Sequence, residues 1–291
     1  MSKATRNRAR SARERIAAQQ AAAKKAEQRR RLLIVGGSVG LVLVIVVGFI
    51  IVKSLAKPAK AGPAGQLPAA VSRNITNVPA TTLSSVGTGA LASSGLPLKP
   101  VTGKALTASG KPEMLYIGAE YCPYCAAMRW SMAVALSKFG TFGPFKGIHS
   151  SPVDVYPNTP TLTFYKQQYT SPYLTFTPVE NLTVKKKMLQ PVTSAQRALW
   201  VQYGTTNGQQ GYPFIDFGNK VALTGPLYAP SVLHGLTWSQ IASKLKNPND
   251  PVSQAVDGAA NYVTASICKM TGDKPGSVCS APQVKSIEAN L

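Results

Sequence analysis

The stretch MLYIGAEYCPYC, residues 114–125, decides the fold of this chain because it places three signals in a row. Residues 114–118 form a short apolar run that predicts a buried strand, and residues 120–125 predict a turn. Helical composition with an apolar stripe then runs from Ala126 to Phe139, where Gly140 ends it. The stretch therefore predicts a strand, a Cys-Pro-Tyr-Cys turn and a helix.

The two cysteines of this turn have the spacing that thiol chemistry requires. Cys122 is expected at the N-terminus of the helix, where unpaired backbone N–H groups and the helix dipole stabilise a thiolate. Cys125 follows one helical turn later and can resolve a mixed disulfide formed on Cys122. Pro123 suits the first helical turn, where a missing N–H costs little. The pattern favours a redox-active pair.

Two structural interpretations of the same pair compete with the redox one. Half of a zinc site would need two more ligands, but Cys268 and Cys279 are too widely spaced to form a second knuckle. The chain has two histidines, His149 and His234, and neither has a partner visible in the sequence. An inert disulfide between positions i and i+3 is uncommon. We therefore predict a catalytic pair, with no metal and no cofactor.

The remainder of the folded part alternates strands with helices. Residues 214–217 and 220–223 flank the pair Gly218-Asn219, which predicts a hairpin. Thr237 and Gln240 fit a capping box at the start of a helix. Further strands are predicted at 161–165 and 173–176, and helices at 194–203, 237–246 and 251–268. This order predicts an α/β fold with a mixed sheet flanked by helices.

The turn and the distant segment GYPFIDFGNK resemble the thioredoxin-like superfamily. More narrowly, the chain is similar to an uncharacterised family of prokaryotic thioredoxin-like proteins, many of them membrane-anchored, that is catalogued as a domain of unknown function. The resemblance covers most of 72–291, although Met128 stands where that family often has an acidic residue. The matching pieces are residues 118–127, 129–130, 139–142, 173–176 and 213–216.

The resemblance implies a thioredoxin-like sheet with insertions and a cis-proline opposite the cysteines. Tyr212-Pro213 is in the matching position, and with Pro123 and Tyr124 it would line the substrate groove. Glu120 would accept the proton of Cys125, or else be an exposed loop carboxylate. Two residues of the helix are expected to have no catalytic role: Trp130 is expected in the core and Arg129 on the surface.

Cys268 and Cys279 are best interpreted as a structural disulfide. Closing a loop of this size stabilises by about 3 kcal/mol in the entropy model. A second redox relay is the alternative.

Residues 32–52 predict a transmembrane helix, because 21 residues without a charge span about 30 Å. Three arginines precede the segment directly, so the positive-inside bias places the N-terminus in the cytoplasm. A cleaved signal peptide, with residues 54–56 as its cleavage site, is the competing interpretation. The expected order is a basic cytoplasmic leader (1–31), the transmembrane helix, a flexible linker (53–71) and an extracytoplasmic domain (72–291).

The formal net charge of +21 does not by itself indicate nucleic-acid binding. Residues 1–31 contribute +9 of that charge, and they contain no aromatic interleaving or recognised nucleic-acid module. The aromatic content of 8% and the hydrophobic content of 44% exclude a wholly disordered chain. The charge of residues 1–31 is better explained as a signal that sets the topology of the chain in the membrane.

These features together predict a single-pass cell-membrane protein that exchanges disulfides with protein thiols outside the cytoplasm. An unidentified membrane or soluble redox partner would restore its cysteines. The alternative is a thioredoxin-like binding or assembly module that holds a partner protein or a soft metal such as Cu(I) on its thiolates.

Overall fold

The computed structural model describes most of the C-terminal part of the chain, which forms one compact unit, Pro58–Leu291. The predicted leader, the predicted transmembrane helix and most of the predicted linker lie outside the described residues. Within the described part, no helix is both long enough and apolar enough to cross a membrane. The described residues are 64–91, 96–206 and 208–291.

The main sheet is mixed, as the sequence predicts. Its central strand β4 (Lys111–Gly118) pairs in parallel with β9 (Thr175–Glu180) and antiparallel with β12 (Phe214–Phe217). Gly118 is the register partner of Glu180, so both strands end at the same edge of the sheet. The sheet is completed by antiparallel strands β13 (Val221–Thr224), β2 (Leu98–Pro100) and β3 (Thr107–Ala108).

Side chains of β4 alternate between two buried faces of this sheet. Met114 and Tyr116 join the larger core, and Leu115 and Ile117 join a smaller core with Trp200 of α5 (Ser194–Tyr203). Because both faces are covered there, the second half of the strand, residues 114–118, is apolar without interruption. The α/β architecture with helices flanking the sheet is confirmed.

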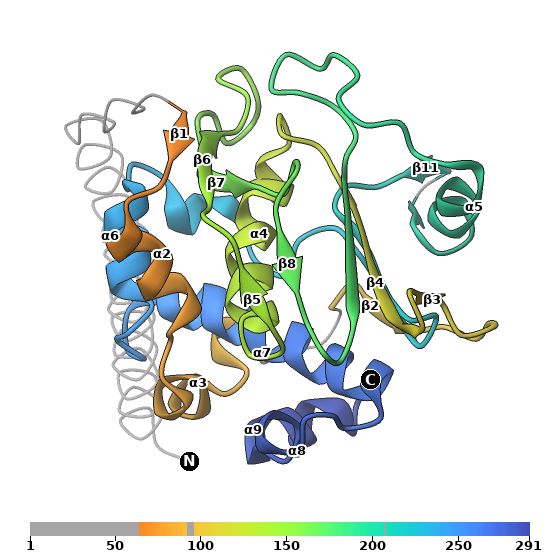
Figure 1. Cartoon of the computed structure of the whole chain (residues 1–291). Coiled ribbons are helices and arrows are strands. Elements are labelled where there is room, and N and C mark those ends of the chain that lie inside the picture. Colours follow the sequence, from red (N-terminus) through yellow and green to blue (C-terminus); the bar gives the residue numbers. More distant parts are fainter. Residues whose placement is uncertain (1–63, 92–95, 207) are drawn as a thin grey trace, which may run out of the picture. The chain divides into compact units, whose positions relative to one another are not determined.

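Helices α4 (Pro123–Leu136) and α7 (Pro251–Thr271) pack against each other in the larger core (Figure 1). Every side chain of α4 except that of Tyr124 is buried, since neighbouring elements cover the helix on all sides. The other helices of the larger core region are α2 (Ala69–Thr76), α3 (Ala80–Val86), α6 (Trp238–Lys244), α8 (Gly276–Cys279), α9 (Pro282–Glu288) and the short 3-10 turns η1 (Gly89–Leu91) and η2 (Pro230–Leu233).

A second, antiparallel sheet lies beside α4, with β7 in contact with that helix. It consists of β1 (Gly65–Gln66), β6 (Lys146–His149) and β7 (Pro160–Thr163). Two small antiparallel pairs complete the strands: β5 (Thr141–Phe142) with β8 (Tyr169–Thr170), and β10 (Thr205–Thr206) with β11 (Gln209–Gln210).

Several local predictions are confirmed. The hairpin turns at Gly218 and Asn219, both at positive φ, and the capping box of Thr237 with Gln240 opens α6. Other boundaries differ: the helix after the cysteines starts at Pro123, and the strand predicted at 173–176 runs over Thr175–Glu180.

Folded structure also begins earlier than the predicted linker allows. The linker prediction, 53–71, overlaps β1 and the start of α2. Leu67 and Val71 are buried in the larger core. Their burial is hidden in the sequence by the surrounding Ala, Pro and Gly, which resemble a spacer in composition.

Candidate functional site

Cys122 lies where β4 has ended and α4 begins. It is the N-cap residue of α4, and its Sγ accepts a hydrogen bond from the backbone N–H of Cys125 at 3.4 Å. Pro123 occupies the first helical position, as predicted. Both thiols are free. The local sequence therefore places the sulfur of Cys122 at the unpaired N–H groups of the first helical turn.

The environment of Cys122 favours its thiolate. A hydrogen bond from the Cys125 thiol is the main cause that lowers the Cys122 pKa, and burial opposes it. The Cys125 N–H and the charge of Arg129 lower the pKa further. The residue is buried but keeps an exposed fraction of 5%, whereas Cys125 keeps none. A thiolate with access to solvent is the nucleophilic form of cysteine.

Cys125 has the opposite character. It is completely buried, and burial raises the pKa of its thiol well above the ordinary value. Its hydrogen bond to Cys122 and the negative charge there raise the pKa further, while Arg129 lowers it. The two sulfurs are thus unequal: the surroundings favour the thiolate of Cys122 and the protonated thiol of Cys125.

Aromatic side chains surround the pair. Tyr121, Tyr124 and Tyr212 pack against the small cluster formed by Ala119 and the two cysteines. Tyr121 and Tyr212 meet edge to face, with ring centroids 6.3 Å apart. The structure therefore brings the predicted groove residues Tyr124 and Tyr212 to the cysteines.

Pro213 directly precedes β12, the strand next to β4. The Tyr212–Pro213 peptide bond is cis, which confirms that prediction. Pro213 itself is buried, and its carbonyl accepts the N–H of Gly225. Tyr212 is the partner that faces the cysteine cluster, and its hydroxyl accepts a hydrogen bond from Asn181 Nδ2 at 2.6 Å.

Glu120 is neither an exposed loop carboxylate nor free. Its Oε1 accepts a hydrogen bond from the Thr163 hydroxyl at 2.8 Å, and partial burial raises its pKa. A raised pKa makes it easier for a carboxylate to take up a proton. Its role toward Cys125 stays a prediction.

The sequence prediction for Arg129 is wrong, because this side chain is completely buried beneath the cysteines. Its guanidinium forms a two-pronged ion pair with Glu180, with nitrogen–oxygen distances of 2.8 and 2.7 Å. Its Nη2 also donates to the carbonyl of Ala119 at 2.8 Å, and Cys122 N donates to the same carbonyl. Trp130 is buried, as predicted.

One sequence signal could have found Arg129. It follows Cys125 by four residues and therefore lies on the same face of α4. An arginine inside an otherwise apolar helix needs a buried partner. That partner, Glu180, ends β9 more than fifty positions away, and no local pattern marks it.

Two polar atoms at this ion pair and on β4 are buried without a hydrogen-bond partner among the described residues. They are Arg129 Nη1 and the Tyr116 hydroxyl.

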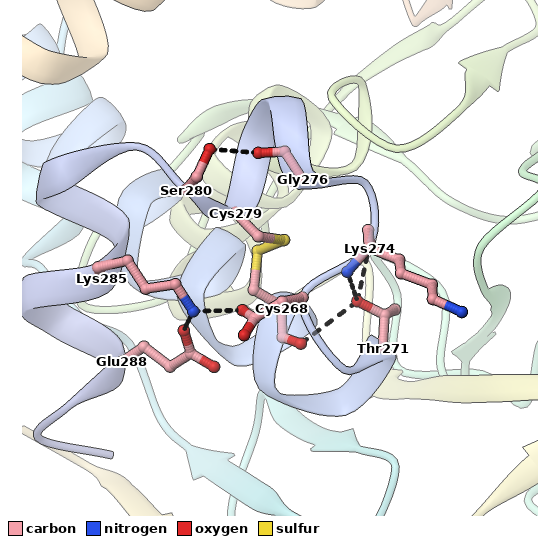
Figure 2. Close-up of a disulfide and its surroundings, with 9 residues drawn as sticks. Cys268, Thr271, Lys274, Gly276, Cys279, Ser280, Lys285 and Glu288 are labelled. Carbon is pink, nitrogen blue, oxygen red and sulfur yellow. Dashed lines mark hydrogen bonds and ion pairs between the residues drawn. A yellow bond between two sulfur atoms is a disulfide. The ribbon is translucent and has the colours of Figure 1, made fainter.

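The second cysteine pair forms the predicted disulfide. Cys268 near the end of α7 is bonded to Cys279 at the end of α8, and both are completely buried (Figure 2). Lys285 of α9 forms ion pairs with Asp273 and Glu288, and Figure 2 shows Lys285 and Glu288 beside this bond. The disulfide therefore joins two helices, and its two cysteines are 11 residues apart in the sequence.

Metal-binding capacity in the described residues rests on few groups. No cluster of three or more His, Cys, Asp or Glu side chains occurs in residues 64–91, 96–206 and 208–291. A soft metal ion held at the site would therefore have the two thiolates of Cys122 and Cys125 as its protein ligands.

Comparison with known proteins identifies one family. A family described as a domain of unknown function (DUF929) matches residues 98–269, which is more than half of the chain and includes the Cys-Pro-Tyr-Cys turn. No curated protein and no solved structure matches. The chain therefore belongs to the DUF929 family.

Proposed function

We propose that this protein is a membrane-anchored thiol–disulfide oxidoreductase that acts on protein disulfides outside the cytoplasm. The observation that carries the proposal is the asymmetry of the free cysteine pair. Cys122 caps a helix and has a lowered pKa, whereas Cys125, one turn later, is buried with a raised pKa. This is the arrangement that sequential disulfide exchange requires.

The exchange proceeds in two steps. The Cys122 thiolate attacks one sulfur of a substrate disulfide, forms a mixed disulfide and releases the other substrate sulfur as a thiolate. Cys125 then loses its proton and attacks Cys122 Sγ. The Cys122–Cys125 disulfide forms, and the second substrate thiolate leaves. The substrate has gained two electrons from the dithiol, and the reverse sequence oxidises a substrate dithiol.

A thioredoxin-like domain is the scaffold that we propose for this chemistry. The order of strand, Cys-Pro-Tyr-Cys turn and helix supports it, as does the position of Tyr212 and Pro213 before the adjacent strand β12. In this scheme Tyr212, Pro213, Pro123 and Tyr124 border the substrate groove. The half-buried Glu120 accepts the proton of Cys125 directly or through water.

Placement outside the cytoplasm rests on the sequence and on the second cysteine pair. Residues 32–52 serve as the anchor, with the N-terminus in the cytoplasm. The Cys268–Cys279 disulfide supports an oxidising compartment, since structural disulfides are rare in the cytosol. A second dithiol or disulfide protein, soluble or in the membrane, must return the cysteines to their starting state.

Trapping of mixed disulfides tests the proposal. With the full-length chain in detergent and insulin as the disulfide substrate, Cys125→Ser is expected to accumulate a covalent adduct that a reductant releases. Cys122→Ser is expected to form none. If neither variant traps insulin, the assigned roles are wrong. Stoichiometric copper on the reduced protein, without disulfide exchange, would favour a metal-binding module.

The direction of electron flow requires a second measurement. Equilibration of the Cys122–Cys125 pair with glutathione gives its reduction potential. A reduction potential of about −120 mV would indicate an oxidant, and one of about −270 mV would indicate a reductant.

A further inference from the structure

The loop that follows β9 forms a hairpin beside Cys122. At the base of the hairpin, the N–H of Glu120 donates to the carbonyl of Leu182 at 2.8 Å, and Leu182 packs against the two cysteines. Its tip, which we call the basic turn, is the segment Thr183–Lys187, closed by a hydrogen bond from Thr183 N to Lys187 O at 2.8 Å. The turn is therefore fixed to the edge of the cysteine site.

Three consecutive exposed lysines, residues 185–187, occupy this turn. The ammonium group of Lys186 lies 4.8 Å from the ring centroid of Tyr121, the residue before Cys122. Such a contact with an aromatic face orients a lysine without neutralising it. The contact therefore places the positive charge of Lys186 against the residue that precedes Cys122.

A second loop, between β6 and β7, borders the site from another side. Its Ser151 donates a backbone hydrogen bond to the carbonyl of Tyr121 at 2.9 Å, and its Tyr156 meets Tyr124 edge to face. Figure 1 shows this loop and the loop leading to α5 rising at the end of the molecule where α4 begins. Asp154 contributes a carboxylate to this loop, near Tyr121 and Tyr124.

Exposed apolar side chains gather on the same two loops. Among the described residues, the exposed large hydrophobic side chains are Val153 (89%), Val155 (68%), Met188 (67%) and Val201 (49%). The first three belong to the two loops, and Met188 directly follows the basic turn. Apolar groups left in water around a reactive site are typical of a surface that binds another protein.

Resting on the proposed function, we infer that the preferred substrates of Cys122 are protein segments in which the reacting cysteine lies among acidic and apolar residues. The basic turn would attract Asp or Glu side chains near the substrate cysteine, and the valines and Met188 would contact its apolar neighbours. Charge at the rim of an interface acts mainly on the rate of encounter and on its salt dependence.

Peptides of opposite charge test this inference. Each peptide has one cysteine in disulfide with thionitrobenzoate, flanked by glutamates, by serines or by lysines. Attack of Cys122 on the peptide sulfur forms the enzyme–peptide disulfide and releases coloured thionitrobenzoate, and Cys125 then releases the peptide thiol. At low salt we expect the acidic peptide to react about tenfold faster than the basic peptide. This difference in rate should disappear at about 1 M salt.

A matched pair of variants in the full-length chain locates the effect. Lys185→Gln/Lys186→Gln/Lys187→Gln removes the charge of the basic turn. The control, Lys104→Gln/Lys220→Gln/Lys274→Gln, removes the same charge from exposed positions outside the two loops. We expect the ratio of the acidic-peptide rate to the serine-peptide rate to fall to about one in the first variant. The control should keep the preference.

Other outcomes overturn the inference and show what failed. Equal loss of the preference in both variants would mean that net charge alone is responsible. If the wild-type protein reacts with all three peptides at the same rate, the acidic preference is refuted, although the proposed exchange activity stands. No release from any peptide would refute the proposed function itself. If only the basic-turn variant loses binding to phosphatidylglycerol vesicles while its peptide rates stay unchanged, the turn faces a membrane instead.

Discussion

The two cysteine pairs of this protein are built in opposite ways. Cys268 and Cys279 are both completely buried and covalently joined, and they link two helices. Cys122 and Cys125 are free, lie within one turn of a single helix, and differ in exposure and pKa. One pair holds its geometry by its own bond, whereas the other relies on hydrogen bonds and charges supplied by its neighbours.

This difference shows what the free pair needs from its surroundings. The turn of Cys122 is supported by the Ala119 carbonyl, by the buried Arg129–Glu180 ion pair and by the start of α4. The disulfide pair needs none of these supports. Variants that remove a noncovalent support should therefore affect the free pair, and removal of the disulfide should affect stability alone.

Loss of Arg129 is expected to have the largest effect on stability. Arg129→Met leaves the Glu180 carboxylate buried without its partner, which costs about 3–5 kcal/mol. Urea unfolding of the full-length chain measures this change. The double variant Arg129→Met/Glu180→Gln should recover part of the loss, because it removes both charges. A single variant with wild-type stability would contradict a supporting role for the ion pair.

Loss of the disulfide is expected to cost less and to leave the chemistry intact. Cys268→Ala/Cys279→Ala should lower the free energy of unfolding by about 3 kcal/mol, since the unfolded chain regains the entropy of the open loop. Insulin reduction at a temperature where the variant stays folded should proceed at the wild-type rate. A large loss of rate in the folded variant would make the second pair a redox relay rather than a structural bond.

The smallest expected effect is a shift in the pH dependence of Cys122. Because its pKa is lowered, alkylation by iodoacetamide should persist below the ordinary thiol pKa and decline as the pH falls through the lowered value. Cys125→Ala removes the hydrogen bond from the Cys125 thiol and should move the midpoint to higher pH. Cys125→Ser, whose hydroxyl can still donate, should move it less. Identical midpoints in both variants would mean that another group sets the pKa.

Much of the local structure could be predicted because its signals are short in range. The Cys-Pro-Tyr-Cys turn, the Gly218-Asn219 hairpin and the Thr237 capping box each depend on residues within a few positions of one another. The disulfide of Cys268 with Cys279 followed from having a single second pair of cysteines. These features need no knowledge of how distant segments meet.

The missed features depend on distant contacts. Arg129 resembles a surface residue until β9 places Glu180 beside it. Residues 64–71 resemble a spacer until Leu67 and Val71 meet the larger core. The basic turn is visible as three lysines, but its position near Cys122 follows from the parallel pairing of β4 with β9. Sequence patterns show which residues can react, and topology decides what surrounds them.

The shared carbonyl of Ala119 has a consequence for the motions of the site. It accepts hydrogen bonds from both the Cys122 amide and Arg129, so the turn cannot open without disturbing the guanidinium and its carboxylate partner. The Cys122 amide proton should consequently exchange with deuterium only in openings that also loosen the end of β9. The Cys-Pro-Tyr-Cys turn and the sheet edge would then form one cooperative unit on the timescale of hydrogen exchange.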